Sequence, residues 1–307
     1  MKIDLHIHSK NSDGADTVEE LVPMIKAAGI DVFALTDHDR TDGWAKAAEL
    51  ANEHGLSFIP GVEITTEGRV RDKDGEIHSF GIHLLAYLPD PNYRQLAKLL
   101  KQLRKERVRR AKRFVKNLRR DFKDLTYRRV RSLAQRDSTI GRPDIVNALL
   151  ELGHLKQFPS KNELYTSDDS PLSKKSRHYV RNEAPDVLDV IKIVRNAGGV
   201  PVIAHPLSRV SSEDEQPTTF PRAHFEAMIQ AGLLGLETRH IEVNKAHRDL
   251  LEAFASEKGL LTTGSSDYHG VSVKKDNPLG CNETSVEMLK RILELGTGTK
   301  PTLNHEF

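Results

Sequence analysis

The chain has 307 residues, of which 37% are hydrophobic and 29% charged, as in an ordinary folded protein and unlike a disordered one. Its one cysteine, Cys281, excludes a disulfide scaffold and a cysteine-ligated zinc cluster. No apolar run approaches the ~18 residues that a membrane-spanning helix needs. No signal peptide follows Met1, so we expect a cytoplasmic protein without membrane contact. The length favours about two domains, or one α/β barrel that carries an insertion.

The total charge of +2 conceals an uneven distribution. Residues 94–142 hold 19 Lys and Arg against 4 Asp and Glu, a net charge of +15. The rest of the chain holds 27 basic against 40 acidic residues, a net charge of −13. This asymmetry predicts an anionic partner at the basic segment and favours cations elsewhere.

Strand and helix patterns alternate through the first ninety residues. Strands are predicted at 2–8, 31–36, 56–63 and 76–88, the last as a strand or hairpin, and helices at 17–28 and 43–54. The first helix has Thr17 as its N-cap and Glu20 three residues later, which is a capping-box pattern. This alternation predicts a parallel sheet covered by helices.

A long amphipathic helix is predicted at 92–122, with a polar face almost entirely of Lys and Arg. Helices at 126–136 and 143–152 and a loop at 156–185 follow, and then the α/β alternation resumes. Its helices are predicted at 186–197, 221–231, 242–257 and 285–295, and its strands at 200–205, 233–238 and 260–267. We therefore predict an α/β barrel of about seven strands in two parts, 1–91 and 185–307, separated by a mainly helical insertion at 92–184.

Six of the 14 histidines and two carboxylates lie at or near the ends of these strands. They are His6, His8, His38, Glu63, His83, His205, Asp267 and His269. The spacing of two between His6 and His8 directs both rings to one face of a strand. Carboxyl ends of barrel strands converge on one rim, where sites are built. A single histidine there would be an ordinary polar side chain, but eight such groups predict a multinuclear site for divalent metals.

Six motifs in this order resemble the polymerase and histidinol phosphatase (PHP) family. They are HIHSKNSDG at 6–14, TDHD at 36–39, GVE at 61–63, HLLAY at 83–87, AHP at 204–206 and GSSDYHG at 264–270. The resemblance covers both barrel parts, about two thirds of the chain, and implies a distorted (β/α)7 barrel with two or three metals. SDG after the first motif and the helical insertion resemble phosphoesterases that act on nucleotides, including nucleoside 3′,5′-bisphosphate phosphatases.

The resemblance also implies how the ligands are shared among three divalent ions (Mn²⁺, Zn²⁺ or Fe²⁺). The first ion would take His6, His8, Glu63 and Asp267, the second Glu63, His83 and His205, and the third Asp13, His38 and His269. Asp13 enters through the resemblance alone, since SDG is also an ordinary turn. His78 is the alternative to His83. Asp4, Asp37 and Asp39 are expected either to orient imidazoles or to be plain polar strand-end residues.

The implied reaction is hydrolysis of a phosphate monoester of a nucleotide, such as AMP or a nucleoside 3′,5′-bisphosphate, by a metal-bridged hydroxide. Three divalent ions carry +6, and three carboxylates with one hydroxide remove 4, which leaves +2 for a phosphate dianion. Catalytic roles are expected for Asp267 and for His240 as a proton donor to the leaving oxygen, a role that a metal-bound water can also fill.

Four cations are candidates to hold the substrate phosphate, although each can also be a solvated surface charge. They are Arg142, Lys175, Arg177 and Arg209. Arg142 lies in GRPDI, which resembles the GRPH element of the family. Asp144 stands where relatives often have histidine, which puts any role of that histidine in doubt.

Three alternatives stay open, with a small phosphorylated nucleotide as the expected partner and no protein partner indicated. An open basic groove would favour 5′–3′ exonuclease action on short RNA. A metal-dependent amidohydrolase or deaminase would call for a strand-end lysine or a modified carboxylate. A non-enzymatic nucleic-acid-binding module would not need the full set of ligands.

Overall fold

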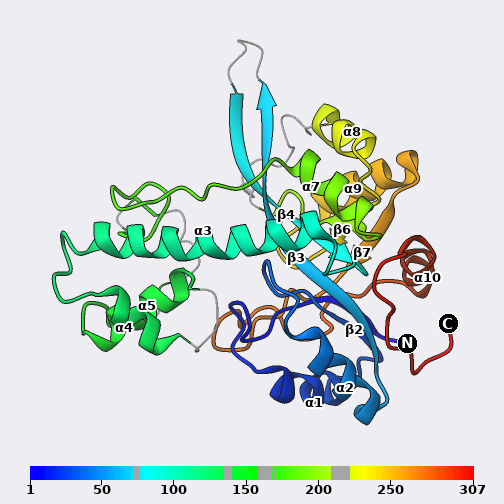
Figure 1. The fold of residues 1–307 in the computed structure, drawn as a ribbon, viewed down its shortest axis with the longest axis horizontal. Helices are drawn as coiled ribbons and strands as arrows, with labels where there is room; N and C mark the ends of the chain where they lie inside the picture. Colours follow the sequence, from blue (N-terminus) through cyan, green and yellow to red (C-terminus); the bar gives the residue numbers. More distant parts are fainter. Residues whose placement is uncertain (72–76, 135–139, 158, 160–166, 169, 209–221) are drawn as a thin grey trace.

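The computed structural model describes residues 1–71, 77–134, 140–157, 159, 167–168, 170–208 and 222–307 (Figure 1). One sheet of seven strands runs in chain order. The strands are β1 (Ile3–Ile7), β2 (Val32–Leu35), β3 (Ser57–Arg71), β4 (Ile77–Tyr87), β5 (Val200–Ile203), β6 (Gly235–Arg239) and β7 (Leu261–Gly264). The two edges meet, since Ile7 bridges to Tyr268 and the His8 amide donates to the Tyr268 carbonyl at 2.9 Å. The sheet is therefore almost closed into a barrel.

β4 departs from the parallel sheet that the sequence predicts and follows the hairpin that was one of the two readings of 76–88. It pairs antiparallel with β3, from Gly61↔Tyr87 to Arg71↔Ile77, and antiparallel with β5. A parallel pair needs a long crossover, whereas β3 and β4 are joined as a hairpin, which forces the antiparallel direction. β3 also continues to Arg71, beyond its predicted end at 63, and the hairpin projects away from the barrel (Figure 1).

Helices pack around the barrel as predicted. They are α1 (Val18–Ala27), α2 (Trp44–His54), α7 (Val187–Asn196), α8 (Arg222–Gln230), α9 (Lys245–Lys258) and α10 (Val286–Leu295). The predicted capping box of α1 is present: the Glu20 amide donates to Thr17 Oγ1 at 3.2 Å, and the Thr17 amide donates to Glu20 Oε2 at 2.8 Å. Strand side chains such as Ile3, Val32 and Val202 fill the core on one side of the sheet, and Phe33 and Leu236 pack against helices on the other. Burial of both faces is typical of parallel strands.

The insertion contributes α3 (Arg94–Leu118), α4 (Tyr127–Leu133) and α5 (Arg142–Glu151). The first half of α3 packs on the barrel core through Leu96, Leu100 and Leu103. Its second half, with Phe114, joins a separate hydrophobic cluster with α4 and α5. One 25-residue helix thus links the barrel to a small helical unit, which lies to its left in Figure 1. None of the described helices has the length and apolar character needed to cross a bilayer.

Candidate metal centre

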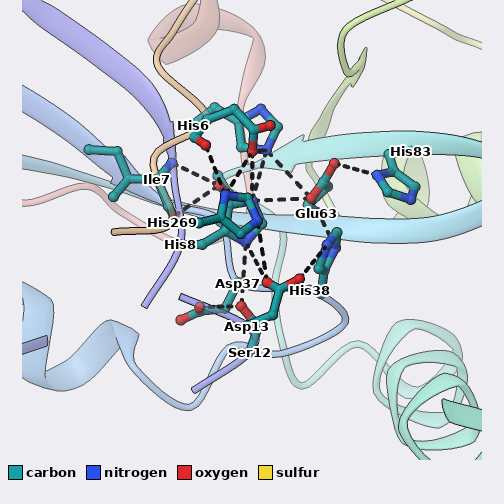
Figure 2. Close-up of polar contacts among 12 residues, drawn as sticks. His6, Ile7, His8, Ser12, Asp13, Asp37, His38, Glu63, His83 and His269 are labelled. Atoms are coloured by element: carbon teal, nitrogen blue, oxygen red, sulfur yellow. Dashed lines mark hydrogen bonds and ion pairs between the residues drawn. The ribbon is translucent and has the colours of Figure 1, made fainter. Parts of the chain in front are cut away.

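The fold brings nine sequence-predicted side chains to one rim, and most of them are labelled in Figure 2. β1 supplies His6 and, just after its end, His8. β3 contains Glu63, and the loop after β1 supplies Asp13. The segments after β2, β5 and β7 supply His38, His205, Asp267 and His269. His83 lies within β4 and reaches the rim because antiparallel pairing places it opposite Thr65, two residues after Glu63. The side chain of His78, its alternative, lies outside the described part of the chain.

A first group of donors consists of His6, His8 and Asp267, all buried. The Nε2 atoms of His6 and His8 face each other at 3.0 Å. Asp267 Oδ1 lies 3.4 Å from His6 Nε2 and 3.3 Å from His8 Nε2. Three ligand atoms of types that divalent transition metals favour therefore converge on one point.

Glu63 lies between this group and the next. Its Oε2 is 3.2 Å from His8 Nε2 and 2.9 Å from His38 Nδ1. Its Oε1 is 2.8 Å from His83 Nδ1 and 3.2 Å from His205 Nε2. A carboxylate whose two oxygens face different sets of imidazoles has the geometry of a bridging ligand, and Figure 2 shows it in this central place.

A third group surrounds Asp13. Its carboxylate lies 3.4 Å from His269 Nε2, 3.6 Å from His38 Nε2 and 3.7 Å from His8 Nδ1. Asp13, the residue that only the family resemblance indicated, is thus among the imidazoles. The grouping is less strictly divided than expected, since His8 takes part in two groups and His38 lies near both Asp13 and Glu63.

The donors fit divalent metal ions. Asp13 Oδ1 and His38 Nδ1 are buried polar atoms without a hydrogen bond, although charged or polar groups lie close to both. Buried polar atoms are normally hydrogen-bonded, so such atoms call for another partner. Each group combines imidazole nitrogens with a carboxylate oxygen, all within 4.8 Å of one another. A bound cation would satisfy these atoms.

Electrostatics divide the histidines into two kinds. Burial alone would lower the pKa of His6, but Glu237, Asp267 and Glu63 hold it well above its usual value. In the same way, Asp267 and Glu63 outweigh burial and raise the pKa of His8 to about 9. Burial lowers the pKa of His38 to about 4, against the opposing effect of Glu63 and Asp13. Without metals, His6 and His8 therefore carry protons that metal ions must displace.

The carboxylates of the site stay ionised. Burial raises the pKa of Glu63, but His38, His83 and His6 hold it well below its usual value. Burial likewise opposes ionisation of Asp267, whose pKa is nevertheless held low by Lys274, His269 and His6. Ionised carboxylates are the form that binds metals.

The described hydrogen bonds of Asp4, Asp37 and Asp39 come from backbone amides, hydroxyl groups and an arginine. Asp37 also reaches an imidazole indirectly, since the Ser12 hydroxyl that donates to it lies 3.4 Å from His8 Nδ1. Asp4 accepts from the amides of Ser266 and Gly280 at 3.1 and 2.9 Å. Asp37 accepts from the Ser9 amide, the Ser9 hydroxyl and the Ser12 hydroxyl at 2.7–2.8 Å. Because these partners belong to the segments beside the metal donors, the two aspartates fix the loops that carry the ligands.

Asp39 has a partner from the insertion. Its Oδ1 accepts from the Thr65 amide at 2.8 Å, and its Oδ2 accepts from Arg107 Nε at 2.6 Å. Arg104 of the same helix donates to the Asp39 carbonyl at 2.8 Å. Helix α3 is therefore attached to the residue that follows His38. Nothing in the sequence distinguished Arg104 and Arg107 from the other cations of the basic segment.

Glu237 in β6 is a site residue that the sequence analysis missed. Its Oε1 accepts from His6 Nδ1 at 3.0 Å and from the Ser265 hydroxyl, and its Oε2 accepts from the His205 amide at 2.8 Å. The bond to Nδ1 leaves Nε2 of His6 as the atom that faces the other ligands. The available signal was a carboxylate inside an apolar strand, LLGLET, where a charge needs a partner.

Asp267 is held on its second oxygen by two side chains. Oδ2 lies 3.3 Å from His240 Nε2 and 2.5 Å from Lys274 Nζ. The Glu242 amide donates to His240 Nδ1 at 3.1 Å, so the proton of a neutral His240 lies on Nε2 and points at Asp267. His240 thus lies at the rim as predicted. Lys274 was not expected from the sequence.

The four phosphate-binding candidates lie in different surroundings. Arg142 is buried at the start of α5, with its guanidinium 5.4 Å from the centre of the Tyr179 ring. Lys175 pairs with Asp168 at 2.8 Å, and Arg177 pairs with Asp121 at 2.5 Å, both on the exposed surface of the insertion. Arg209 lies outside the described residues.

Comparison with known proteins points to the same family that the sequence motifs resemble. The PHP domain model matches residues 4–156. The 3′,5′-nucleoside bisphosphate phosphatase of Chromobacterium violaceum is 29% identical over 95% of this chain and 98% of its own length. The 5′–3′ exoribonuclease of Haemophilus influenzae is 29% identical over 87% of this chain and 90% of its own.

Two solved structures share the fold. A Bifidobacterium adolescentis protein described as a metal-dependent phosphoesterase is 33% identical over 96% of both chains, with a TM-score of 0.81. A Chromobacterium violaceum protein described as an amidohydrolase with bound sulfate is 23% identical over 97% of this chain and 98% of its own, with a TM-score of 0.76. The predicted family resemblance and the barrel fold are confirmed.

Proposed function

The chain belongs to the PHP family, and from that premise we propose that it is a metal-dependent hydrolase that removes phosphate from nucleotides. Three overlapping groups of imidazoles and carboxylates on one rim carry the proposal. Such a site suits phosphate ester hydrolysis. The name of one relative favours nucleoside 3′,5′-bisphosphates as substrates. We propose AMP and similar nucleotides as the alternative substrates.

We propose three Mn²⁺, Zn²⁺ or Fe²⁺ ions, because imidazole-rich ligation suits these metals. The residues that would hold them are His6, His8, Asp13, His38, Glu63, His83, His205, Asp267 and His269. When bound, the ions would activate water and neutralise charge on the phosphoryl oxygens. We propose that two of the ions share Glu63 as a ligand, since its two oxygens face different imidazoles.

His240 is proposed to donate the proton that the leaving oxygen needs. It would act as the imidazolium, because a neutral imidazole is too weak an acid to give up its remaining proton, and its Nε2 lies 3.3 Å from Asp267 Oδ2 at the rim. Protonation of Nδ1 would require the Glu242 amide, which donates to that atom in the structure, to turn away. Lys274 donates to the same oxygen of Asp267, Oδ2. This supports the proposal that Asp267 would bind a metal through Oδ1 alone. His240→Asn should lower turnover and change its pH profile. An unchanged turnover and profile would exclude His240 from the proton transfer.

Arg142 is the favoured phosphate ligand among the four candidates. It is buried beside α3, whereas Lys175 and Arg177 have acidic partners on the surface of the insertion. We propose the insertion, residues 92–184, as the substrate-covering unit between barrel parts 1–91 and 185–307. The attachment of Arg104 and Arg107 beside His38 supports this, since it brings α3 to the rim.

The test is a phosphate-release screen with added Mn²⁺ over AMP, adenosine 3′,5′-bisphosphate and a short 5′-phosphorylated RNA. Asp267→Asn, which removes a charged donor at the rim, should abolish release, and Glu252→Gln on the exposed face of α9 should not. No release from any of the three would contradict the proposal. Ammonia release without phosphate release would indicate a deaminase instead.

A second candidate is 5′–3′ exoribonuclease action. One observation favours it: α3 exposes Lys98, Lys101, Lys105 and Arg109 at steps of three and four residues, which places them on one face. Such a face can follow a phosphate backbone. Stepwise release of mononucleotides from the RNA, stronger than phosphate release from AMP, would favour this function.

A further inference from the structure

The residue that follows His38 links the metal centre to the inserted helices. Asp39 is fully buried, and its backbone φ of 56° lies in the left-handed region that residues other than glycine rarely adopt. Such a conformation persists only where the surrounding contacts hold it. The contacts that hold Asp39 come from two sides, strand β3 of the barrel and helix α3 of the insertion.

On the barrel side, Asp39 is bonded to the strand that carries Glu63. Its amide donates to the Glu63 carbonyl at 2.9 Å, and its Oδ1 accepts from the Thr65 amide at 2.8 Å. The Thr65 hydroxyl donates to Oδ2 at 3.0 Å, and Thr65 lies opposite His83 in the pairing of β3 with β4. Asp39 therefore joins the backbone segments that carry three of the proposed metal ligands, His38, Glu63 and His83.

On the side of the insertion, two arginines of α3 complete these contacts. Arg107 Nε donates to Asp39 Oδ2 at 2.6 Å, and its Nη2 donates to the Thr65 hydroxyl at 2.5 Å. Arg104 Nη1 donates to the Asp39 carbonyl at 2.8 Å. The side chain of Arg107 is 18% exposed and that of Asp39 is 0% exposed, so little water screens this ion pair. A planar guanidinium that contacts both Asp39 and Thr65 fixes the position of one relative to the other.

We propose that Arg107, assisted by Arg104, is a positioning residue for the metal centre. By fixing Asp39 against Thr65, it holds His38 and Glu63 in place for a shared metal ion, at the observed 2.9 Å between His38 Nδ1 and Glu63 Oε2. Without the two arginines, Asp39 can leave its left-handed conformation, and the backbone of His38 turns with it.

The same contacts couple the insertion to the metal centre in both directions. If docking of α3 raises the affinity for metal, then metal binding must strengthen the docking of α3 by the same factor, because such coupling is reciprocal. The inference rests on the metal ligands proposed above, and it does not depend on which ester the protein hydrolyses.

The first test is a calorimetric Mn²⁺ titration of the EDTA-treated protein. Arg107→Met should lower the Mn²⁺ affinity by about tenfold or more, as is usual when a group that orients a metal ligand is lost. The control is Arg109→Met, whose side chain is 70% exposed two residues further along α3, and it should leave the affinity unchanged. A double-mutant cycle with His38→Ala separates positioning from a general loss of stability. The effect of Arg107→Met should be much smaller in the His38→Ala protein, whereas independent effects would add.

The second test can be read in the wild type, so it does not depend on whether a variant folds. Adding Mn²⁺ to the EDTA-treated wild type should slow hydrogen exchange of the α3 amides, and this protection should be lost in Arg107→Met.

Three results would overturn the coupling. They are an Mn²⁺ affinity of Arg107→Met within about twofold of the wild type, fully additive effects in the cycle, and α3 exchange that Mn²⁺ leaves unchanged in a wild type that binds it. None of these would contradict the proposed hydrolase. Conversely, a protein that shows both effects but releases no phosphate would refute the phosphatase and retain the coupling.

Discussion

Replacing Glu237 by glutamine should reverse the proton position on His6. The two oxygen positions of the Glu237 carboxylate are not equivalent, because the His205 amide donates to Oε2 and needs an acceptor there. The amide oxygen of the new side chain must stay there, and its NH₂ group then occupies the Oε1 position, facing His6 Nδ1 and the Ser265 hydroxyl. The NH₂ group can only donate, so the single proton that a neutral His6 keeps when it binds metal must lie on Nε2.

This change blocks one metal ligand at little cost in volume. His6 Nε2 is the atom that lies 3.0 Å from His8 Nε2 and 3.4 Å from Asp267 Oδ1. Loss of such an orienting carboxylate typically weakens metal affinity by about 10–100-fold. At about 1.4 kcal/mol for each tenfold, the loss is about 1.4–2.8 kcal/mol of binding free energy.

Calorimetric Mn²⁺ titration of the EDTA-treated protein measures this loss. Glu252→Gln is the matched control, since Glu252 pairs with Arg239 at 3.0 Å on the surface of α9. We expect its Mn²⁺ affinity to equal that of the wild type. A folded Glu237→Gln protein that binds Mn²⁺ within about twofold of the wild type would refute the tautomer argument.

Three further outcomes are expected. Arg107→Met should destabilise the EDTA-treated protein by about 3 kcal/mol in urea unfolding, because it strands the buried carboxylate of Asp39, whereas Arg109→Ala should change stability little. Because the pKa of His8 is raised to about 9, its contribution to the stability of the metal-free protein is full below pH 6.5 and is lost as the pH rises through about 9. The gain in Tm on adding Mn²⁺ should therefore grow over that pH window. Leu149→Ala, fully buried in the cluster of the insertion, should cost about 2–5 kcal/mol and make the insertion the first site of proteolysis.

Each of these can fail in a recognisable way. An Arg107→Met protein as stable as the wild type would mean that Asp39 is satisfied by Thr65 alone. A Tm gain that shrinks from pH 6.5 to 9 would contradict the proton competition at His8. First cleavage of Leu149→Ala within the barrel would contradict a separately packed helical unit.

The sequence predicted the side chains that the fold gathers at the rim, because their pattern is local. Imidazoles are uncommon side chains, and His6 and His8 at a spacing of two on a strand can only point to the same face. The direction of β4 was not predictable in the same way. Alternating apolar residues identify a strand, but its direction depends on the short hairpin to β3.

Residues that act through partners distant in the chain escaped the sequence analysis. Glu237 contacts His6 across 231 positions, and Arg107 contacts Asp39 across 68. Neither residue belongs to a motif, and each looks ordinary beside its sequence neighbours. Only the closed barrel, or the packing of α3 against it, reveals their partners. For Asp4, Asp37 and Asp39 the opposite holds: the sequence placed them at strand ends near the motifs, but it did not show which groups donate hydrogen bonds to them.

The basic segment illustrates how composition and structure answer different questions. The excess of cations in this segment predicted that its ligand is an anion. A net charge counts every Lys and Arg equally, so it does not show which of them contact that ligand. In the folded chain, Arg104, Arg107 and Arg110 follow one another at steps of three along α3. Arg104 and Arg107 donate to Asp39 of the barrel, and Arg110 lines a cavity between α3 and α5. Lys105 and Arg109 on the same turns face solvent. The helical period, rather than the charge total, therefore separates the cations that can meet a bound phosphate from those that only attract it at a distance.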